Sequence, residues 1–300
     1  MEKKTIIWLI SAVLLIIIGS IGFTASLAGS AWDITRLSTT EYETNEYIIT
    51  DDFHSISINT DTADIVFLTD NDIGTSVTCY EQENMYHKVS VKNDTLVIDV
   101  IDTREWYEFI GIFLGKPKIT IKIPQHKYSD VTVGTDTGDV SLGETVIGTV
   151  SIKTSTGDIN LQNLSAGKLD LAVSTGKIIL SDVVCQGDIK VSVSTGKANL
   201  NDIQCANLIS TGDTGDINLQ NVVASESLSI ERDTGDVRFD SCDAAEISVE
   251  TDTGDVTGSL KTDKVFIVET DTGKIKIPNT KSGGTCKIQT DTGDISIQIA

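Results

Sequence analysis

Aliphatic side chains recur at every second position in short runs along residues 131–299, and the runs come in pairs around a glycine. Around Gly157, Val150 and Ile152 lie seven and five residues before the glycine, and Ile159 and Leu161 lie two and four after it. A spacing of two is the period of a β-strand whose alternate side chains share one face. The pattern therefore predicts two short strands joined at each glycine, with a second, looser corner eight to eleven residues after it.

The glycines themselves form a repeat. Each stands in a Thr-Gly-Asp or Thr-Gly-Lys tripeptide, at steps of 19 or 20 residues: Gly138, Gly157, Gly176, Gly196, Gly215, Gly235, Gly254, Gly273 and Gly293. A fixed period in this range is typical of proteins in which each unit buries its apolar face against its neighbours. We predict an all-β, single-stack parallel β-solenoid over residues 131–300, right-handed because parallel crossovers almost always are. Glycine is the expected structural turn residue because it reaches positive φ without a steric penalty.

Residues 47–130 have the same two-residue spacing without the regular repeat. The predicted strands are His54–Asn59, Asp64–Thr69, Thr75–Tyr80, Thr95–Ile101 and Lys118–Ile123. Ala63 stands where a glycine would be in a worn copy of the turn. We interpret this section as an N-terminal cap with irregular coils, since a solenoid needs atypical ends to cover its open strand edges.

The N-terminal segment is apolar and long enough to cross a membrane. No charge occurs from Thr5 to Trp32, while Lys3 and Lys4 precede this run. About 20 apolar residues span a bilayer as a helix, and flanking lysines favour the cytoplasmic side. We predict a cytoplasmic segment 1–4, a transmembrane signal anchor 5–28, a stalk 29–46, and a single-pass cell-membrane protein with an extracellular β domain. The alternative is a cleaved signal peptide with its cleavage site among the small residues at 26–31.

Two local features suggest contacts at the ends of the solenoid. Residues 104–115 hold the densest aromatic patch, which we expect to cover the end of the core, with contact to the membrane surface or to a partner as the alternative. At the other end, an Ile-Ser-Ile-Gln-Ile run reaches Ala300 half a coil after the last glycine. An unprotected strand edge there would be a template for pairing, so we expect self-association through the C-terminal strand edge.

The chain is strongly acidic. Its formal net charge is −21, and residues 33–300 carry 21 basic and 43 acidic side chains. Nucleic acids and anionic lipid surfaces attract the opposite charge, so we expect neither as a partner of the solenoid.

Part of this acidity is ordered within the repeats. In the last five coils aspartates precede the glycine by two residues or follow it by one, and the candidate metal ligands among them are Asp213, Asp233, Asp252, Asp271, Asp291, Asp216, Asp236 and Asp255. Stacked coils would bring equivalent carboxylates to about 4.8 Å from one another, where unit charges repel by about 1 kcal/mol in water-like surroundings. We favour turn hydrogen bonds and salt screening as the compensation, with no cofactor. A calcium ladder is the alternative, because calcium prefers clustered carboxylate oxygens.

Little in the sequence indicates catalysis or a disulfide framework. The five cysteines are odd in number and sparse, and Cys185 and Cys205 fall at a repeat position that elsewhere holds alanine, so we expect buried thiols. The histidines, His54, His87 and His126, lie outside the regular repeats, and no catalytic motif is present. We therefore predict that the protein is not an enzyme. A polysaccharide-acting β-helix enzyme is the weakest alternative, because its groove needs loops that these repeats lack.

The motifs resemble a known family. An N-terminal apolar helix, the strand Phe53–Ile58, the strand Ile119–Pro124 and the Thr-Gly-Asp-Ile turns are similar to the bacterial putative-adhesin domain family of unknown function. The resemblance covers roughly residues 50–300 and implies a β-helical extracytoplasmic domain. We therefore predict a non-catalytic binding or structural module of the cell envelope, with a cell-wall glycan or envelope protein as partner. The alternative, from relatives that accompany stress regulators, is an accessory of an envelope-stress response.

Overall fold

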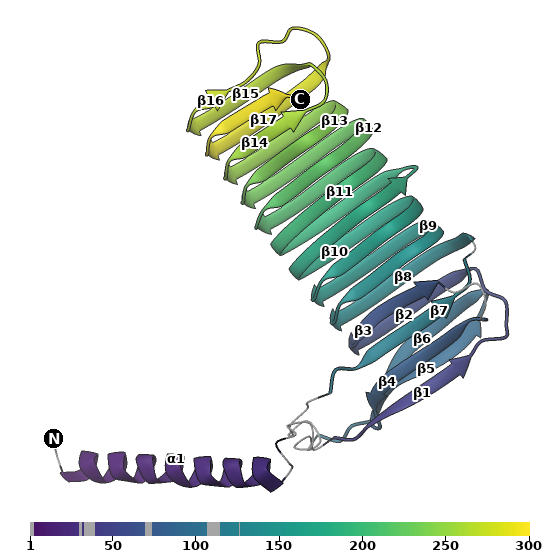
Figure 1. Ribbon diagram of the computed structural model, residues 1–300, viewed down its shortest axis with the longest axis vertical. Coiled ribbons are helices and arrows are strands. Elements are labelled where there is room, and N and C mark those ends of the chain that lie inside the picture. The colour runs from purple at the N-terminus through teal and green to yellow at the C-terminus, as the bar shows by residue number, and fades with distance from the viewer. Residues whose placement is uncertain (1–2, 30–31, 33–39, 70–73, 107–114, 126) are drawn as a thin grey trace.

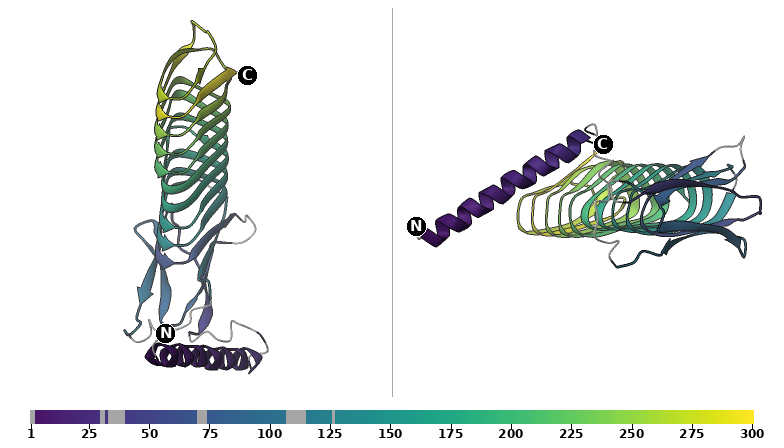
Figure 2. Two further views of the ribbon diagram at one scale, coloured as in Figure 1. Left: turned by 90° about the vertical axis from the view of Figure 1, so that its left-hand side faces the viewer. Right: turned by 90° about the horizontal axis from the view of Figure 1, so that it is seen from below.

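The computed structural model describes residues 3–29, 32, 40–69, 74–106, 115–125 and 127–300. It is a stack of β-coils with a single helix, α1 (Lys3–Gly29), near one end (Figures 1 and 2). The apolar segment Trp8–Gly29 of α1 has a mean hydropathy of 2.3, and apart from Leu27 its side chains are exposed. An exposed apolar helix of this length fits a membrane anchor or a signal sequence.

The central coils confirm the predicted solenoid. The strands are β8 (Lys127–Thr137), β9 (Val140–Thr156), β10 (Ile159–Cys185), β11 (Asp188–Thr214), β12 (Ile217–Thr234), β13 (Val237–Thr253) and β14 (Val256–Leu260). Each pairs in parallel with the next, and equivalent repeat positions face one another, as Leu169 faces Ile189. Successive Thr-Gly corners therefore lie along one axis, as the repeat requires.

The core is built from the predicted apolar positions and from two more in each coil. The aliphatics on both sides of the repeat glycines are almost completely buried, except around Gly273, where they are half-buried or exposed. In the coils from Gly138 to Gly235 the side chains seven and nine residues after the glycine are buried as well, for example Leu164 and Ala166, or Val183 and Cys185. These extra positions give the core a third wall, so the interior is a continuous stack of Ile, Leu and Val.

The looser corner is in fact two corners. The first lies six residues after the glycine and has positive φ: Glu144, Asn163, Asp182, Asp202, Asn221 and Ser241. Asn and Asp tolerate this left-handed conformation better than most residues, which explains their frequency there. The second includes Gly148, Gly167 and Gly187, where a Cβ would lie 2.5–2.7 Å from a carbonyl oxygen of the neighbouring coil.

The N-terminal end is capped by antiparallel strands. The strands are β1 (Tyr42–Ile48), β2 (Ser55–Thr62), β3 (Asp64–Thr69), β4 (Ser76–Gln82), β5 (Met85–Lys92), β6 (Thr95–Asp102) and β7 (Lys118–Ile123). β4 and β5 run antiparallel to β7 and β6, and β1 runs antiparallel to β4. β1 begins inside the segment expected to be a stalk, whose residues 33–39 lie outside the described residues.

The first coil in the sequence is not the first in space. β2 lies between β6 and β8, and β3 lies between β7 and β9. Ala63, at the turn between β2 and β3, stacks directly against Gly138, so it does take the glycine place. The chain therefore builds the first coil, leaves it to form the cap, and returns to stack β8 and β9 on its other side.

The C-terminal end repeats this exchange and corrects one prediction. β17 (Gly284–Thr292) pairs with β13 on one side and with β15 (Lys264–Thr272) on the other. β18 (Ile295–Ile299) pairs with β14 and also with the two-residue strand β16 (Ile275–Lys276). The prediction of an open edge on the C-terminal run is therefore wrong for Ile295 and Ser296, whereas residues 297–299 pair with β14 alone. Self-association through this strand stays a prediction. The outermost coil is formed by β15 and β16, at the end away from α1 (Figure 1).

Candidate functional site

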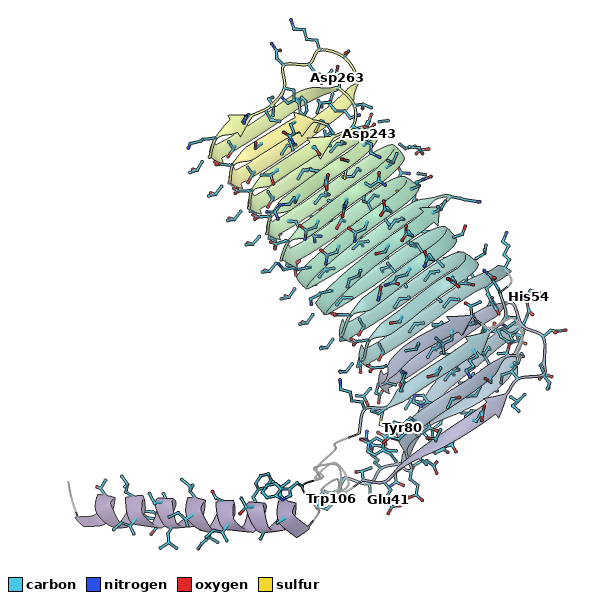
Figure 3. All side chains as sticks on the ribbon, in the orientation of Figure 1. Glu41, His54, Tyr80, Trp106, Asp243 and Asp263 are labelled. Carbon is cyan, nitrogen blue, oxygen red and sulfur yellow. The ribbon has the colours of Figure 1, made fainter. Side chains whose placement is uncertain are left out.

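The Thr-Gly corners form one continuous edge along the solenoid, which we call the Thr-Gly edge. It consists of the nine repeat glycines, the threonine before each, and the residues two before and one after each glycine. Figure 3 shows the rows of side chains that the stacked coils present along the solenoid. Because the coils are in register, each repeat position becomes a column that runs along the solenoid.

Glycine is required on this edge mainly because neighbouring coils touch there. A Cβ at any of the nine repeat glycines would lie 1.6–2.2 Å from the carbonyl oxygen of the equivalent residue in the adjacent coil. Seven of the nine also have a positive φ, between 129° and 158°, whereas Gly254 and Gly273 do not lie in this range. Positive φ, which the sequence suggested as the reason, is therefore only part of it, and the close backbone approach is common to all nine.

The aspartates that follow the glycines have a structural task. The Oδ1 atom of each accepts a hydrogen bond from the backbone N–H of the equivalent residue in the adjacent coil, at 2.8–3.3 Å. One run begins at Asp64 and ends at the N–H of Lys177, and the other begins at Asp216 and ends at the N–H of Lys274. Between them Lys197 forms an ion pair with Asp216 at 2.8 Å. Backbone donors and lysines thus stabilise this carboxylate column without requiring a metal ion.

Threonines three residues before the glycine secure the corner from inside. The hydroxyls of Thr135, Thr154, Thr270 and Thr290 donate to backbone carbonyl oxygens of the same or an adjacent corner. Arg232 takes this position in one coil. Its side chain is only 3% exposed, and its Nη2 donates a hydrogen bond to Ser210 Oγ at 2.8 Å. Its guanidinium occupies the space over Gly212, where a Cβ would lie 1.7 Å from Nη1.

Two columns of the Thr-Gly edge remain free to meet a ligand. The threonines directly before the glycines are exposed in all nine coils, and their hydroxyls make no hydrogen bond to the described part of the chain. In the last five coils of the sequence the aspartates two residues before the glycine are exposed and equally unbonded: Asp213, Asp233, Asp252, Asp291 and Asp271, in their spatial order. The eight aspartates proposed for calcium thus fall into two columns. Only the column two residues before the glycine has both carboxylate oxygens of each aspartate free of hydrogen bonds. Calcium binding stays a prediction.

A pair of substitutions separates the structural from the metal-binding role. We expect Asp236→Ala to destabilise the solenoid by about 1 kcal/mol, because the N–H of Asp255 loses its acceptor. Asp236→Asn should be neutral or slightly stabilising, since an amide oxygen accepts the same bond and one negative charge leaves the column. Urea unfolding followed by circular dichroism would measure both. Equal losses in the two variants, or a melting temperature that calcium raises in the wild type only, would favour a carboxylate-bound cation.

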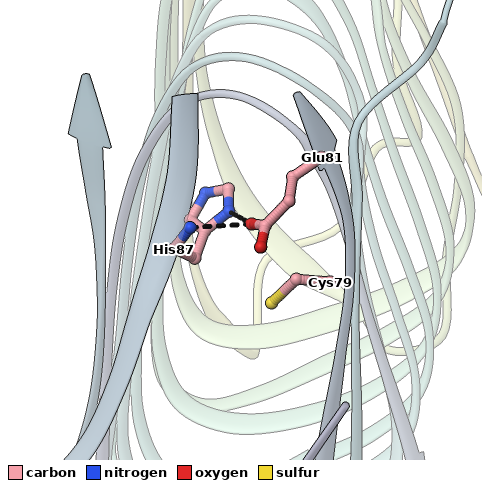
Figure 4. Close-up of side chains that lie close together, drawn as sticks. All are labelled: Cys79, Glu81 and His87. Carbon is pink, nitrogen blue, oxygen red and sulfur yellow. Dashed lines mark hydrogen bonds and ion pairs between the residues drawn. The ribbon is translucent and has the colours of Figure 1, made fainter. Parts of the chain in front are cut away.

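The cap holds a buried polar cluster that sequence spacing did not indicate. Cys79, Glu81 and His87 are each at most 2% exposed, and their ligand-type atoms lie within 4.8 Å of one another (Figure 4). Glu81 Oε2 accepts hydrogen bonds from the backbone N–H of His87 at 2.7 Å and from its Nδ1 at 2.6 Å. Asn45 donates to Glu81 Oε1, and Thr60 Oγ1 bonds His87 Nε2 at 2.7 Å. The cluster therefore ties β1, β2, β4 and β5 together with its partners satisfied within the chain.

Among the described residues, His54 and the five cysteines form no reactive centre. His54 pairs with Asp94 at 2.8 Å on the exposed surface, and His126 lies outside the described residues. All five cysteines are free and buried, as expected for Cys185 and Cys205. Burial raises the pKa of Cys79, Cys205 and Cys286 to about 12, so these side chains are neutral thiols at physiological pH rather than nucleophilic thiolates.

The aromatic patch is described only at its ends. Residues 107–114 lie outside the described residues. Trp106 is 76% exposed, and the ring of Tyr42 lies over Gly115, where a Cβ would lie 2.3 Å from the ring. Tyr42 also stacks on Tyr80 with ring centroids 5.3 Å apart. Whether the patch covers the core or contacts another surface therefore stays a prediction.

One solved structure shares this fold, and others match it more weakly. An adhesin from Bacteroides fragilis, described as putative, is 18% identical, covers 87% of this chain and 97% of its own, and has a TM-score of 0.50. Putative adhesins from Parabacteroides distasonis and Parabacteroides merdae are 12% and 14% identical, cover 86% and 87% of this chain and 98% and 97% of their own, and have TM-scores of 0.45 and 0.44. At these identities the first match shows the fold alone.

Sequence comparison places the chain more firmly. No curated protein matches it. The family model described as Toastrack DUF4097 matches residues 53–208 and again residues 184–300, which together include the first coil, the cap strands after β1 and all of the regular repeats. The chain therefore belongs to the Toastrack DUF4097 family.

Proposed function

We propose that the protein is a non-catalytic binding module of the cell envelope, anchored by α1, whose Thr-Gly edge binds a repetitive polymer such as a cell-wall glycan. One observation carries this proposal: the Thr-Gly edge repeats a free threonine hydroxyl in each of its nine coils, and the last five coils in the sequence add a free carboxylate beside it. Coils are about 4.8 Å apart, so a polymer with regularly spaced hydroxyl groups can make the same contact many times. The solved neighbours described as putative adhesins support a binding role.

The non-catalytic part of the proposal rests on the chemistry of the described residues. The buried carboxylate Glu81 and its histidine are bonded to one another and closed off from solvent, and the thiols are neutral. A hollow of about 290 Å³ lies where the Thr-Gly edge meets the cap, lined by Thr137, Asp139 and Lys116 among others. Its lining combines exposed apolar surface with the threonine, aspartate and lysine side chains, which suits one end of a bound glycan. We propose an extracytoplasmic location and a cytoplasmic N-terminus on the basis of α1 and the two lysines before its apolar run.

Matched hydroxyl deletions test this function. We expect the triple variant Thr156→Val, Thr234→Val and Thr253→Val to lose most of the binding of full-length protein to insoluble cell-wall material in a co-sedimentation assay. Valine conserves shape and removes only the hydroxyl, and losses at several repeated contacts multiply. The control variant carries Ser151→Ala, Ser229→Ala and Ser248→Ala, which removes the same number of hydroxyls from another face of the same coils. Unchanged binding in the threonine variant, or equal loss in both variants, would contradict the proposal.

A further inference from the structure

The outermost coil, residues 261–283 with β15 and β16, has an open strand edge. β15 pairs with β17 on one side, and no described strand pairs with its other side. The only bond that covers this edge among the described residues is from the Thr280 hydroxyl to the carbonyl of Lys264, at the beginning of the strand. Free N–H and C=O groups along the remainder of β15 are a template for another strand.

This edge strand is also apolar on its outward face, unlike the strands beneath it. Ile267 and Val265 point outward and are 57% and 40% exposed. In the three coils beneath, the positions in register with Ile267 are Lys287, Ser248 and Ser229, and those in register with Val265 are Thr285, Glu246 and Ser227. The half-buried Phe266 and Val268 occupy the inward face. Natural edge strands are normally protected by charge or by a covering segment, and β15 has an aliphatic and aromatic run instead.

The charge of this coil is opposite to that of the solenoid. Residues 261–283 hold five lysines and three acidic residues, whereas the rest of residues 33–300 holds 16 basic and 40 acidic side chains. Lys274, Lys276 and Lys281 are exposed, and no hydrogen bond or ion pair of their side chains occurs in the described structure. If a second copy of the chain paired with this edge, its lysines would lie close to these lysines and repel them. An acidic partner would instead complement their charge.

We propose that the free edge of β15 is a strand-addition site for an extended polypeptide segment of a partner protein, with alternating aliphatic residues and acidic flanks. Backbone hydrogen bonds to the edge provide affinity, the exposed aliphatics select alternate apolar side chains, and the lysines select the flanking charge. The site lies at the end of the solenoid away from α1, so the partner is met at the far end from the anchor (Figure 1). This role is independent of polymer binding on the Thr-Gly edge.

A labelled peptide of alternating valine and threonine with aspartates at both ends is the probe, and fluorescence anisotropy with the full-length chain in detergent micelles measures its binding. We expect Val265→Thr with Ile267→Lys, which gives β15 the outward residues of β17, to weaken binding at least tenfold. The matched control is Ile209→Ser, which removes an exposed aliphatic from the same column in a coil with both edges paired. The control should bind as the wild type does. Equal binding by the double variant and the wild type would overturn the proposal.

Two further arms use only the wild-type protein, so the test does not depend on a variant that folds. Alternate amide N–H groups of a strand point to opposite edges, so two peptides are made, each N-methylated along one edge only. The peptide whose methylated edge faces β15 should not bind, and the other should bind with normal affinity. Equal affinities of these two, high or low, would contradict strand addition. Lysine-flanked peptide should bind at least tenfold more weakly than the aspartate-flanked form at low salt. Light scattering would overturn the proposal if the wild type were a dimer and the double variant a monomer, because the edge would then bind a second copy of the chain.

Discussion

Replacing Gly215 by alanine should destabilise the solenoid by at least about 3 kcal/mol, which is in the upper part of the range for single substitutions. The new Cβ would lie 1.6 Å from the carbonyl oxygen of Gly196 and 2.7 Å from its carbonyl carbon, so backbone rather than a flexible side chain would have to move. The φ of 129° adds strain for any residue with a Cβ. Because each coil is bonded only to its neighbours, separating these two coils divides the stack into two shorter pieces.

Gly143→Ala is the matched control for this substitution. A Cβ there would meet its nearest atom, the carbonyl oxygen of Gln162, at 3.5 Å, which is ordinary contact. It should be neutral or stabilise by up to about 1 kcal/mol, since alanine restricts the unfolded chain. Urea unfolding measures both variants, and hydrogen exchange should show lost protection in the coils on either side of Gly215. Coincident unfolding curves for Gly215→Ala and the wild type would show that the coils do not approach as closely as described.

Replacing Glu81 by glutamine should destabilise the cap by about 3 kcal/mol, because a buried donor or acceptor left without its partner costs most of its desolvation energy. The carboxylate accepts from Asn45, from the N–H of His87 and from its Nδ1. A glutamine amide offers one oxygen and turns its NH₂ toward one of those donors. Glu83→Gln, on the exposed turn between β4 and β5, is the control and should change the free energy of unfolding by less than about 0.5 kcal/mol.

The same carboxylate gives the cap a defined pH dependence. Burial alone would raise the pKa of Glu81, but hydrogen bonds from His87 and Asn45 outweigh it and hold that pKa below its ordinary value. A lowered pKa in the folded state stabilises above the unfolded value of about 4.3, and this contribution is lost as the pH falls through the folded pKa. The wild type should therefore lose stability below about pH 4.3 more steeply than Glu81→Gln does. Parallel pH profiles of the two proteins would contradict the assignment.

The interior of the repeat could be predicted from residue spacing because its physical causes are local. Each coil has the same alternation of apolar residues around its glycine, so the inward positions follow from the period of a strand. Ala63 could be recognised as a glycine substitute, and Cys185 and Cys205 as buried thiols, from their places in that period alone. The main reason why glycine is required at the corner could not be predicted from the sequence. The carbonyl oxygen that excludes a Cβ belongs to another coil, and the two meet only when the coils stack.

The cap cluster lay beyond the sequence for a similar reason. Cys79, Glu81 and His87 come from β4 and β5, while Asn45 and Thr60 come from β1 and β2. Their spacing matches no motif, and they meet only because an antiparallel cap folds over the first coil. A histidine within a strand pattern that places it inward was the one available signal, and a buried histidine needs partners whose identity the pattern does not specify.

What the sequence determined by itself is the coil: its length, its inward residues, its glycine corner and the apolar helix that precedes the stack. What only the tertiary structure decided is the order of coils at both ends, where β2 and β3 and then β17 and β18 lie between strands that follow or precede them in the chain. The physical reason is that every coil has nearly the same apolar pattern, so any one can stack on any other. The choice among these arrangements depends on contacts between residues far apart in sequence. It leaves β15 as the outermost long strand and covers the C-terminal strand at Ile295 and Ser296.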